Sequence, residues 1–215
     1  METGLHKAEA NEIISTKPTE PQKKSNPTQN LSDISIGKIK SSTFVIQKYI
    51  EKPLLINNRK FDIRVWVLMT QDLKVYFFKE GYIRTSSEIF SLSEENIGKD
   101  YVHLTNNAVQ INSENYGKYE DGNQMSFDDF QQYLEIEDPE LVEDVLRELP
   151  VGKDEEVDLK GYITNEMKKM VGVTFLSSKE QFLKNHKNSS FEIFGFDFIM
   201  DSKLKLWLLE VNTNP

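Results

Sequence analysis

The chain has 215 residues, of which 38% are hydrophobic and 28% charged, and these values fit one globular domain or slightly more. It contains no cysteine, so disulfide bonds and thiolate metal sites are excluded. No apolar run approaches the roughly 20 residues of a membrane-spanning helix, and the first residues lack the apolar core of a secretory signal. We therefore expect a cytoplasmic protein whose partners are neither membranes nor nucleic acids.

The net charge of -9 is unevenly distributed along the chain. Sixteen of the 35 acidic residues, but three of the 26 basic residues, lie between Glu114 and Asp158, which leaves a net charge of +4 on the remainder. We interpret the acidic segment as a solvated face. The remainder can still face an anionic ligand.

Residues 1–42 are polar and rich in Lys, Thr, Ser, Asn and Pro, so they can bury little apolar surface. We interpret them as a flexible lead-in to a domain that occupies residues 43–215. The β-branched and aromatic residues at 44–50 predict a strand, which Pro53 ends.

A second strand is predicted over residues 61–69, where alternation separates two faces. A turn at residues 71–72 leads to a third strand at 74–79, predicted to form a hairpin with the second. Residues 81–84 are expected to continue toward a loop. One face of the second strand carries Phe61, Ile63, Val65, Val67 and Met69, and the other carries Lys60, Asp62 and Arg64.

Helices are predicted at residues 126–134 and 161–170. The first has Ser126 at its N-cap and a buried stripe of Phe127, Phe130 and Leu134. Strands at 191–200 and 206–212, joined by a turn at 201–205, end the chain. Helices between antiparallel hairpins favour an α+β or a mixed α/β class.

The last hairpin brings chemical groups together. Alternation places Leu206, Leu208, Glu210 and Asn212 on one face, and pairing Asp201 with Leu206 places Asp197 opposite Glu210. Two opposed carboxylates repel each other unless a cation lies between them. Oxygen ligands of this kind suit Mg²⁺, although an exposed acidic face on an ordinary hairpin is the alternative.

Basic and amide groups accompany this hairpin in two other places. Lys60 and Arg64 alternate with Asp62 on one strand face, and Arg84 follows the next hairpin, so these cations can hold a phosphate or a carboxylate. Solvated strand positions are the alternative. Residues 103–107 can either bind a ligand or form a turn with local side-chain bonds.

The chain resembles the tubulin–tyrosine ligase family through an ordered set of motifs that spans residues 44–215. These motifs are VIQKYIEKPLL at 45–55, RKFDIRVWVL at 59–68, GYIRT at 81–85, HLTN at 103–106, FGFDF at 194–198 and WLLEVN at 207–212. The resemblance implies the carboxyl-side portion of an ATP-grasp fold, with a mixed, mainly antiparallel sheet and packed helices. It also implies an ATP- and Mg²⁺-dependent ligase that activates a carboxylate as an acyl phosphate, which an amine then attacks.

The resemblance also assigns roles by position. Arg64 and Arg84 look like catalytic residues that hold phosphate or the amino-acid carboxylate, and Asp197, Glu210 and Asn212 look like the Mg²⁺ ligands. Tubulin, through its acidic carboxyl-terminal tail, and a free amino acid are the implied partners, at the cytoskeleton or a cilium. The implied nucleotide contacts are Gln47, Lys48, Tyr49, Ile50, Lys60, Asp62, Thr105 and Asn106.

Residues 107–110 read NAVQ and depart from the pattern of glutamate-adding members, while residues 115–125 look most like the tyrosine-adding type. Tyrosine is therefore the amino acid that we expect to be added, and a glycine-adding activity is the alternative. The family's upstream lysine and glycine-rich loop are not matched, so we expect a truncated chain that ligates poorly alone. A non-catalytic binding module and a ligase for small molecules are the competing hypotheses.

Overall fold

The computed structural model describes residues 45–148, 158–184, 191–213 and 215, and the lead-in predicted for residues 1–42 lies outside this part. The chain divides into two compact units, Met1–Gln47 and Lys48–Pro215. Residues 45–50 form no strand, and Val45 and Ile46 are 85% and 96% exposed. The strand prediction was therefore wrong for residues 45–50, because β-branched composition does not form a strand without a neighbouring strand to pair with.

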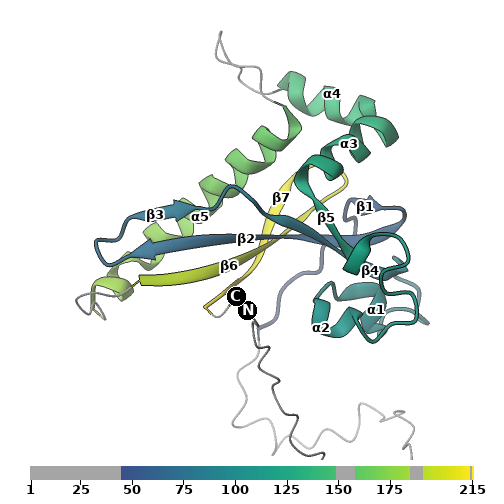
Figure 1. Cartoon of the computed structure of the whole chain (residues 1–215), viewed down its shortest axis with the longest axis horizontal. Coiled ribbons are helices and arrows are strands. Elements are labelled where there is room, and N and C mark those ends of the chain that lie inside the picture. The colour runs from purple at the N-terminus through teal and green to yellow at the C-terminus, as the bar shows by residue number, and fades with distance from the viewer. Residues whose placement is uncertain (1–44, 149–157, 185–190, 214) are drawn as a thin grey trace, which may run out of the picture. The chain divides into compact units, whose positions relative to one another are not determined.

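The second unit is built on a sheet whose central path runs β5-β4-β2-β6-β7, with β1 and β3 also paired to β2 (Figure 1). Every strand pair of the described residues is antiparallel, which confirms the α+β, mainly antiparallel expectation. The strands are β1 (Leu55–Ile56), β2 (Arg59–Thr70), β3 (Val75–Phe77), β4 (Tyr82–Ile89), β5 (Gln124–Ser126), β6 (Phe191–Met200) and β7 (Leu206–Asn212).

The long strand β2 organises the sheet, since it pairs with four others. The turn before it contains Asn57 and Asn58, both at positive φ, as a two-residue hairpin requires. The predicted hairpin of β2 with β3 is confirmed. Residues 82–89 form strand β4 rather than a loop, because Tyr82–Thr85 align with β2 and fill its other edge.

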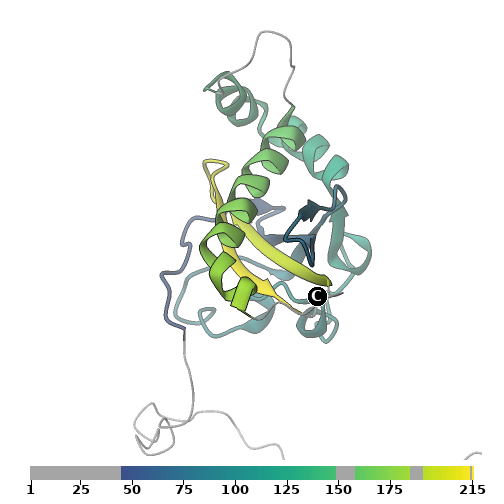
Figure 2. The ribbon, with the colours of Figure 1, turned by 90° about the vertical axis from the view of Figure 1, so that its left-hand side faces the viewer.

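Figure 2 shows α5 crossing β6 and β7 on one face of this sheet. The predicted helix at 126–134 is confirmed as α3 (Phe127–Glu137), while the one at 161–170 is part of the longer α5 (Leu159–Lys184). No helix in the described ranges is long and apolar enough to cross a membrane. The sequence did not reveal the short strands β1 and β5. It also did not reveal the helices α1 (Asp100–His103), α2 (Asn107–Gln110), η3 (Asp121–Asn123) and α4 (Pro139–Glu148).

The core lies between α3, α5 and the odd-numbered face of β2. Phe61 meets Phe130 of α3 with ring centroids 5.1 Å apart, and Phe175 of α5 meets Phe196 of β6 at 5.8 Å. The predicted stripe of Phe127, Phe130 and Leu134 is buried. By contrast, the acidic side chains of α3 and α4 are exposed, in agreement with the solvated-face interpretation. The opposite face of the sheet is therefore free to carry polar groups.

We expect Ser126→Ala to lower the free energy of unfolding by about 1 kcal/mol, and Ser126→Gly by a few tenths. The Ser126 hydroxyl accepts a hydrogen bond from Asp129 N at 3.1 Å and so caps α3. Urea unfolding of both variants measures the difference. Ser177→Ala, in the exposed middle of α5, is the control and should not destabilise; equal losses at both positions would contradict the capping role.

Candidate functional site

The terminal hairpin has an irregular register that decides which side chains meet. Met200, rather than Asp201, pairs with Leu206, and a shift after Leu208 then places Asp197 opposite Glu210. The predicted pairing of Asp197 with Glu210 is thus confirmed. The predicted pairing of Asp201 with Leu206 at the turn is wrong by one residue, since Met200 takes that place. The extra residue, Leu209, is a β-bulge.

The bulge also changes which residues share a face. Leu206 and Leu208 pack with the core, as does Val211, so Glu210 and Asn212 lie on the opposite face. The prediction that Leu206, Leu208, Glu210 and Asn212 share one face was wrong, because it assumed unbroken alternation. Without the bulge, Glu210 and Asn212 would point into the core.

Asp197, Glu210 and Asn212 meet on this polar face. The Asn212 amide donates to Glu210 Oε1 at 3.0 Å and to Asp197 Oδ2 at 3.4 Å. Asp197 is 2% exposed, whereas Glu210 is exposed and its carboxylate has no other hydrogen-bond partner among the described residues. No cluster of three or more His, Cys, Asp or Glu side chains suited to a metal occurs in the described part, so a metal here would rely on two carboxylates and an amide.

Two arginines approach Asp197 from neighbouring strands. Arg64, opposite Asp197 in the β2–β6 register, bonds both carboxylate oxygens, one of them at 3.0 Å. Arg84 of β4 bonds Asp197 at 3.0 Å and Asp62 at 2.7 Å. Because Gly195 has no side chain, the Arg64 guanidinium can lie over it; a Cβ there would be 3.3 Å from Arg64 Cζ.

This arrangement shifts the carboxylate pKa values in opposite directions. Burial raises the pKa of Asp197, but hydrogen bonds and charge from Arg64 and Arg84 outweigh burial, and the net pKa is lowered. Burial dominates at Asp62, whose pKa is raised despite the hydrogen bond from Arg84. Asp197 is therefore held as an anion.

Lys60 and Tyr49 lie together near α1. The Lys60 ammonium donates to His103 O at 2.7 Å and lies 5.0 Å from the centre of the Tyr49 ring. The Tyr49 hydroxyl hydrogen bonds with His103 Nδ1 at 2.9 Å, and His103 Nε2 lies 3.0 Å from Asn96 O. Burial lowers the pKa of Lys60, against the effect of Asp62.

The other residues that were predicted to contact the nucleotide differ in how exposed they are. Residues 104–106 form the turn between α1 and α2, so the predicted loop at 103–107 is shorter than expected. Thr105 is 7% exposed and offsets part of the rise that burial causes in the pKa of Asp62, while Asn106 is exposed. Gln47 and Lys48 are exposed, and Ile50 is half-buried.

A buried ion pair behind this face was missed by the sequence analysis. Arg59 is 1% exposed, lies 2.5 Å from Glu120 and bonds Thr85 and Ser86 at 3.1 and 2.9 Å. The Arg59 guanidinium also stacks on Tyr119 at 4.2 Å. A signal was present, since Arg59 occupies a core-facing position in the alternation of β2, where an arginine requires a buried partner.

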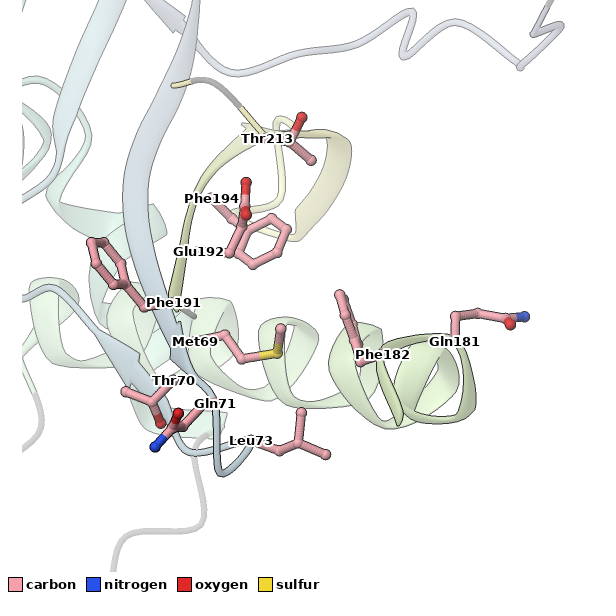
Figure 3. Close-up of a pocket in the computed structure, with 10 residues that line it drawn as sticks. All are labelled: Met69, Thr70, Gln71, Leu73, Gln181, Phe182, Phe191, Glu192, Phe194 and Thr213. Carbon is pink, nitrogen blue, oxygen red and sulfur yellow. The ribbon is translucent and has the colours of Figure 1, made fainter. Parts of the chain in front are cut away.

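The described residues also form a pocket of about 400 Å³ at the far end of β2 (Figure 3). In Figure 3, Met69 of β2, Leu73 of the following turn and Phe182 of α5 project toward one another. None of the predicted site residues lines it, and its walls are largely apolar. The lining residues are Met69, Thr70, Gln71, Leu73, Gln181, Phe182, Phe191, Glu192, Phe194 and Thr213.

Deleting Leu209 tests the role of the bulge directly. Removal of this residue makes Leu208 and Glu210 neighbours in a regularly alternating strand, in which both keep their present partners and faces. We therefore expect the deletion variant to lose the bulge and still to hold Glu210 opposite Asp197. Leu209→Ala keeps the residue count and should retain the native hairpin; NMR contacts between β6 and β7 that no longer place Glu210 opposite Asp197 in the deletion would contradict this register.

The fold and this face define an α+β domain with a charged sheet face. The chain belongs to the tubulin-tyrosine ligase family, whose model matches residues 5–215. It is 35% identical over 196 residues to tubulin glycylase 3B of Tetrahymena thermophila, covering 88% of this chain and 14% of that protein. It is 34% identical over 187 residues to the probable tubulin polyglutamylase TTLL9 of Bos taurus, covering 86% of this chain and 36% of that protein.

A third relative is the human tubulin polyglutamylase TTLL5, 32% identical over 179 residues, with 80% of this chain and 13% of that protein covered. The chain thus spans about a third or less of these relatives. Their names refer to glycine and glutamate, so the expectation of tyrosine receives no support, whereas the glycine or glutamate alternative does.

Proposed function

We propose that this domain binds ATP with Mg²⁺ on its charged sheet face, as part of a ligase that joins an amino acid to tubulin. The observation that supports this most is the meeting of Asp197, Glu210 and Asn212 on one face beside the half-buried Arg64 and the buried Arg84. The names of the relatives support tubulin as the acceptor.

The charge balance of the face supports a cation as part of the ligand. The formal charges of its three cationic side chains and three carboxylates cancel. A triphosphate beside Asp197 and Glu210 would be repelled unless a divalent ion lay between them. The donor set fits Mg²⁺ if the Asn212 amide turns so that Oδ1 faces the ion. The six charged residues are Lys60, Arg64 and Arg84, and Asp62, Asp197 and Glu210.

The proposed reaction has two steps. A carboxylate oxygen attacks the γ-phosphorus of ATP and ADP leaves; the amine then attacks the acyl carbon, and phosphate and a proton are released. Arg64 and Arg84 would stabilise the charge on the phosphoryl oxygens. Mg²⁺, when bound, supplies further electrostatic stabilisation of those oxygens.

We propose that the amino acid that is added is glycine rather than glutamate. Residues 107–110 depart from the pattern of glutamate-adding members, and relatives at 35% and 34% identity are named glycylases. Labelled glycine, glutamate and tyrosine should be compared with tubulin as the acceptor. Incorporation of tyrosine alone would overturn this choice without affecting the nucleotide site.

Nucleotide binding can be tested separately from ligation. We expect the melting temperature of the 215-residue chain to rise with millimolar ATP and Mg²⁺, and not with ATP and EDTA. Glu210→Gln should abolish the rise. If the melting temperature does not change when ATP and Mg²⁺ are added, the result contradicts the proposal and favours a non-catalytic binding module.

A further inference from the structure

Gln110, the last residue of α2, is completely buried although its side chain is polar. All its side-chain polar atoms have partners. Ser87 N of β4 donates to Gln110 Oε1 at 2.8 Å, and Gln110 Nε2 donates to Leu104 O and, at 3.5 Å, to Tyr101 O. This side chain therefore joins the end of α1 to strand β4.

Gln110 contacts the peptide groups that precede and follow residues 105–106. Its side chain binds the carbonyl of Leu104, and its backbone N–H donates to the carbonyl of Asn106 at 3.0 Å. Gln110 thus fixes the carbonyl before Thr105, and together with Val109 N it holds the carbonyl of Asn106. The bond to Ser87 anchors Gln110 to the sheet.

The turn approaches the same sheet at a second point. The buried Thr105 side chain acts on Asp62 of β2 and offsets part of the rise that burial causes in the pKa of that carboxyl, and Asp62 is paired with Arg84, three residues before Ser87 on β4. Asn106, next in the chain, is exposed, and its side chain makes no hydrogen bond within the described part of the chain. A ligand above this face would meet a fixed Thr105 and a free Asn106 amide.

We infer that Gln110 is a positioning residue of the proposed nucleotide site, which sets the turn at residues 104–106 without touching the nucleotide. This inference rests on the proposed function. Its physical basis is preorganisation: a turn already held in one geometry loses less conformational freedom when the ligand binds. The burial and complete pairing of Gln110 explain how a four-residue helix can hold the turn.

The test uses Gln110→Met, which keeps the size of the side chain but removes its hydrogen bonds. We expect the dissociation constant for a fluorescent ATP analogue with Mg²⁺ to increase on the order of tenfold, as for the loss of one hydrogen bond. Thr105→Val should weaken binding similarly. Because Gln110 acts through Thr105, the double variant should be little worse than either single variant.

Hydrogen exchange separates this inference from the proposed function. Without nucleotide, Gln110→Met should accelerate exchange of the amides at residues 104–110, whereas Gln132→Met, at an exposed glutamine of α3, should change neither exchange there nor affinity. A parent chain that binds no nucleotide overturns the proposed function. Unchanged exchange, or independent effects of Gln110→Met and Thr105→Val, overturns the positioning role. If Gln110→Met does not fold, Gln110→Leu replaces it, because it removes the same hydrogen bonds with an uncharged side chain of similar size.

Discussion

Replacing Asp197 by alanine is expected to lower the free energy of unfolding by about 3–5 kcal/mol, the usual cost of removing one partner from a buried ion pair. Asp197 is 2% exposed and accepts hydrogen bonds from both Arg64 and Arg84. Without it, Arg64 has no carboxylate partner among the described residues, and Arg84 keeps only Asp62. Urea unfolding monitored by circular dichroism measures the change.

Glu210→Ala is the matched comparison for this prediction. Glu210 is also proposed to hold the cation, but it is exposed and bonded only to Asn212 in the described part of the chain. We therefore expect its stability change to stay within about 0.5 kcal/mol, although nucleotide binding should be lost. The result that would contradict this account is an Asp197→Ala protein as stable as Glu210→Ala.

Replacing Glu120 by alanine is expected to cost a similar amount, about 3–5 kcal/mol, because Arg59 would stay charged and buried. The Glu120 side chain is 9% exposed and bonds both Arg59 and Thr85. These contacts attach the segment before β5 to strands β2 and β4. Thermal and urea unfolding of the variant give the magnitude.

The double variant Arg59→Met with Glu120→Leu should recover most of that loss, since it removes both charges and leaves neither one unpaired. On the surface, the Glu143–Arg147 pair of α4 provides the control, and Glu143→Ala should be without measurable effect. If Glu120→Ala behaves like Glu143→Ala, the buried pair does not hold this segment.

Alternation along β2 was sufficient to predict its core face and its charged face. Periodicity likewise predicted α3, because Ser126 and the stripe of Phe127, Phe130 and Leu134 are local signals. The strand at residues 45–50 failed for the opposite reason, since composition there indicated an extended chain but could not supply a pairing partner. Short helices such as α1 and α2 were missed because four residues carry too little periodicity to detect.

The sequence by itself determined that β6 and β7 pair, that Asp197 and Glu210 lie opposite each other, and which family the motifs resemble. The tertiary structure alone decided that a bulge at Leu209 turns Glu210 and Asn212 to the polar face, that both arginines bind Asp197, and that Gln110 and the Arg59–Glu120 pair hold the neighbouring segments. Strand pairing follows from patterns repeated over many residues. A single inserted residue or a buried polar contact depends on how distant segments pack, and no local pattern encodes it.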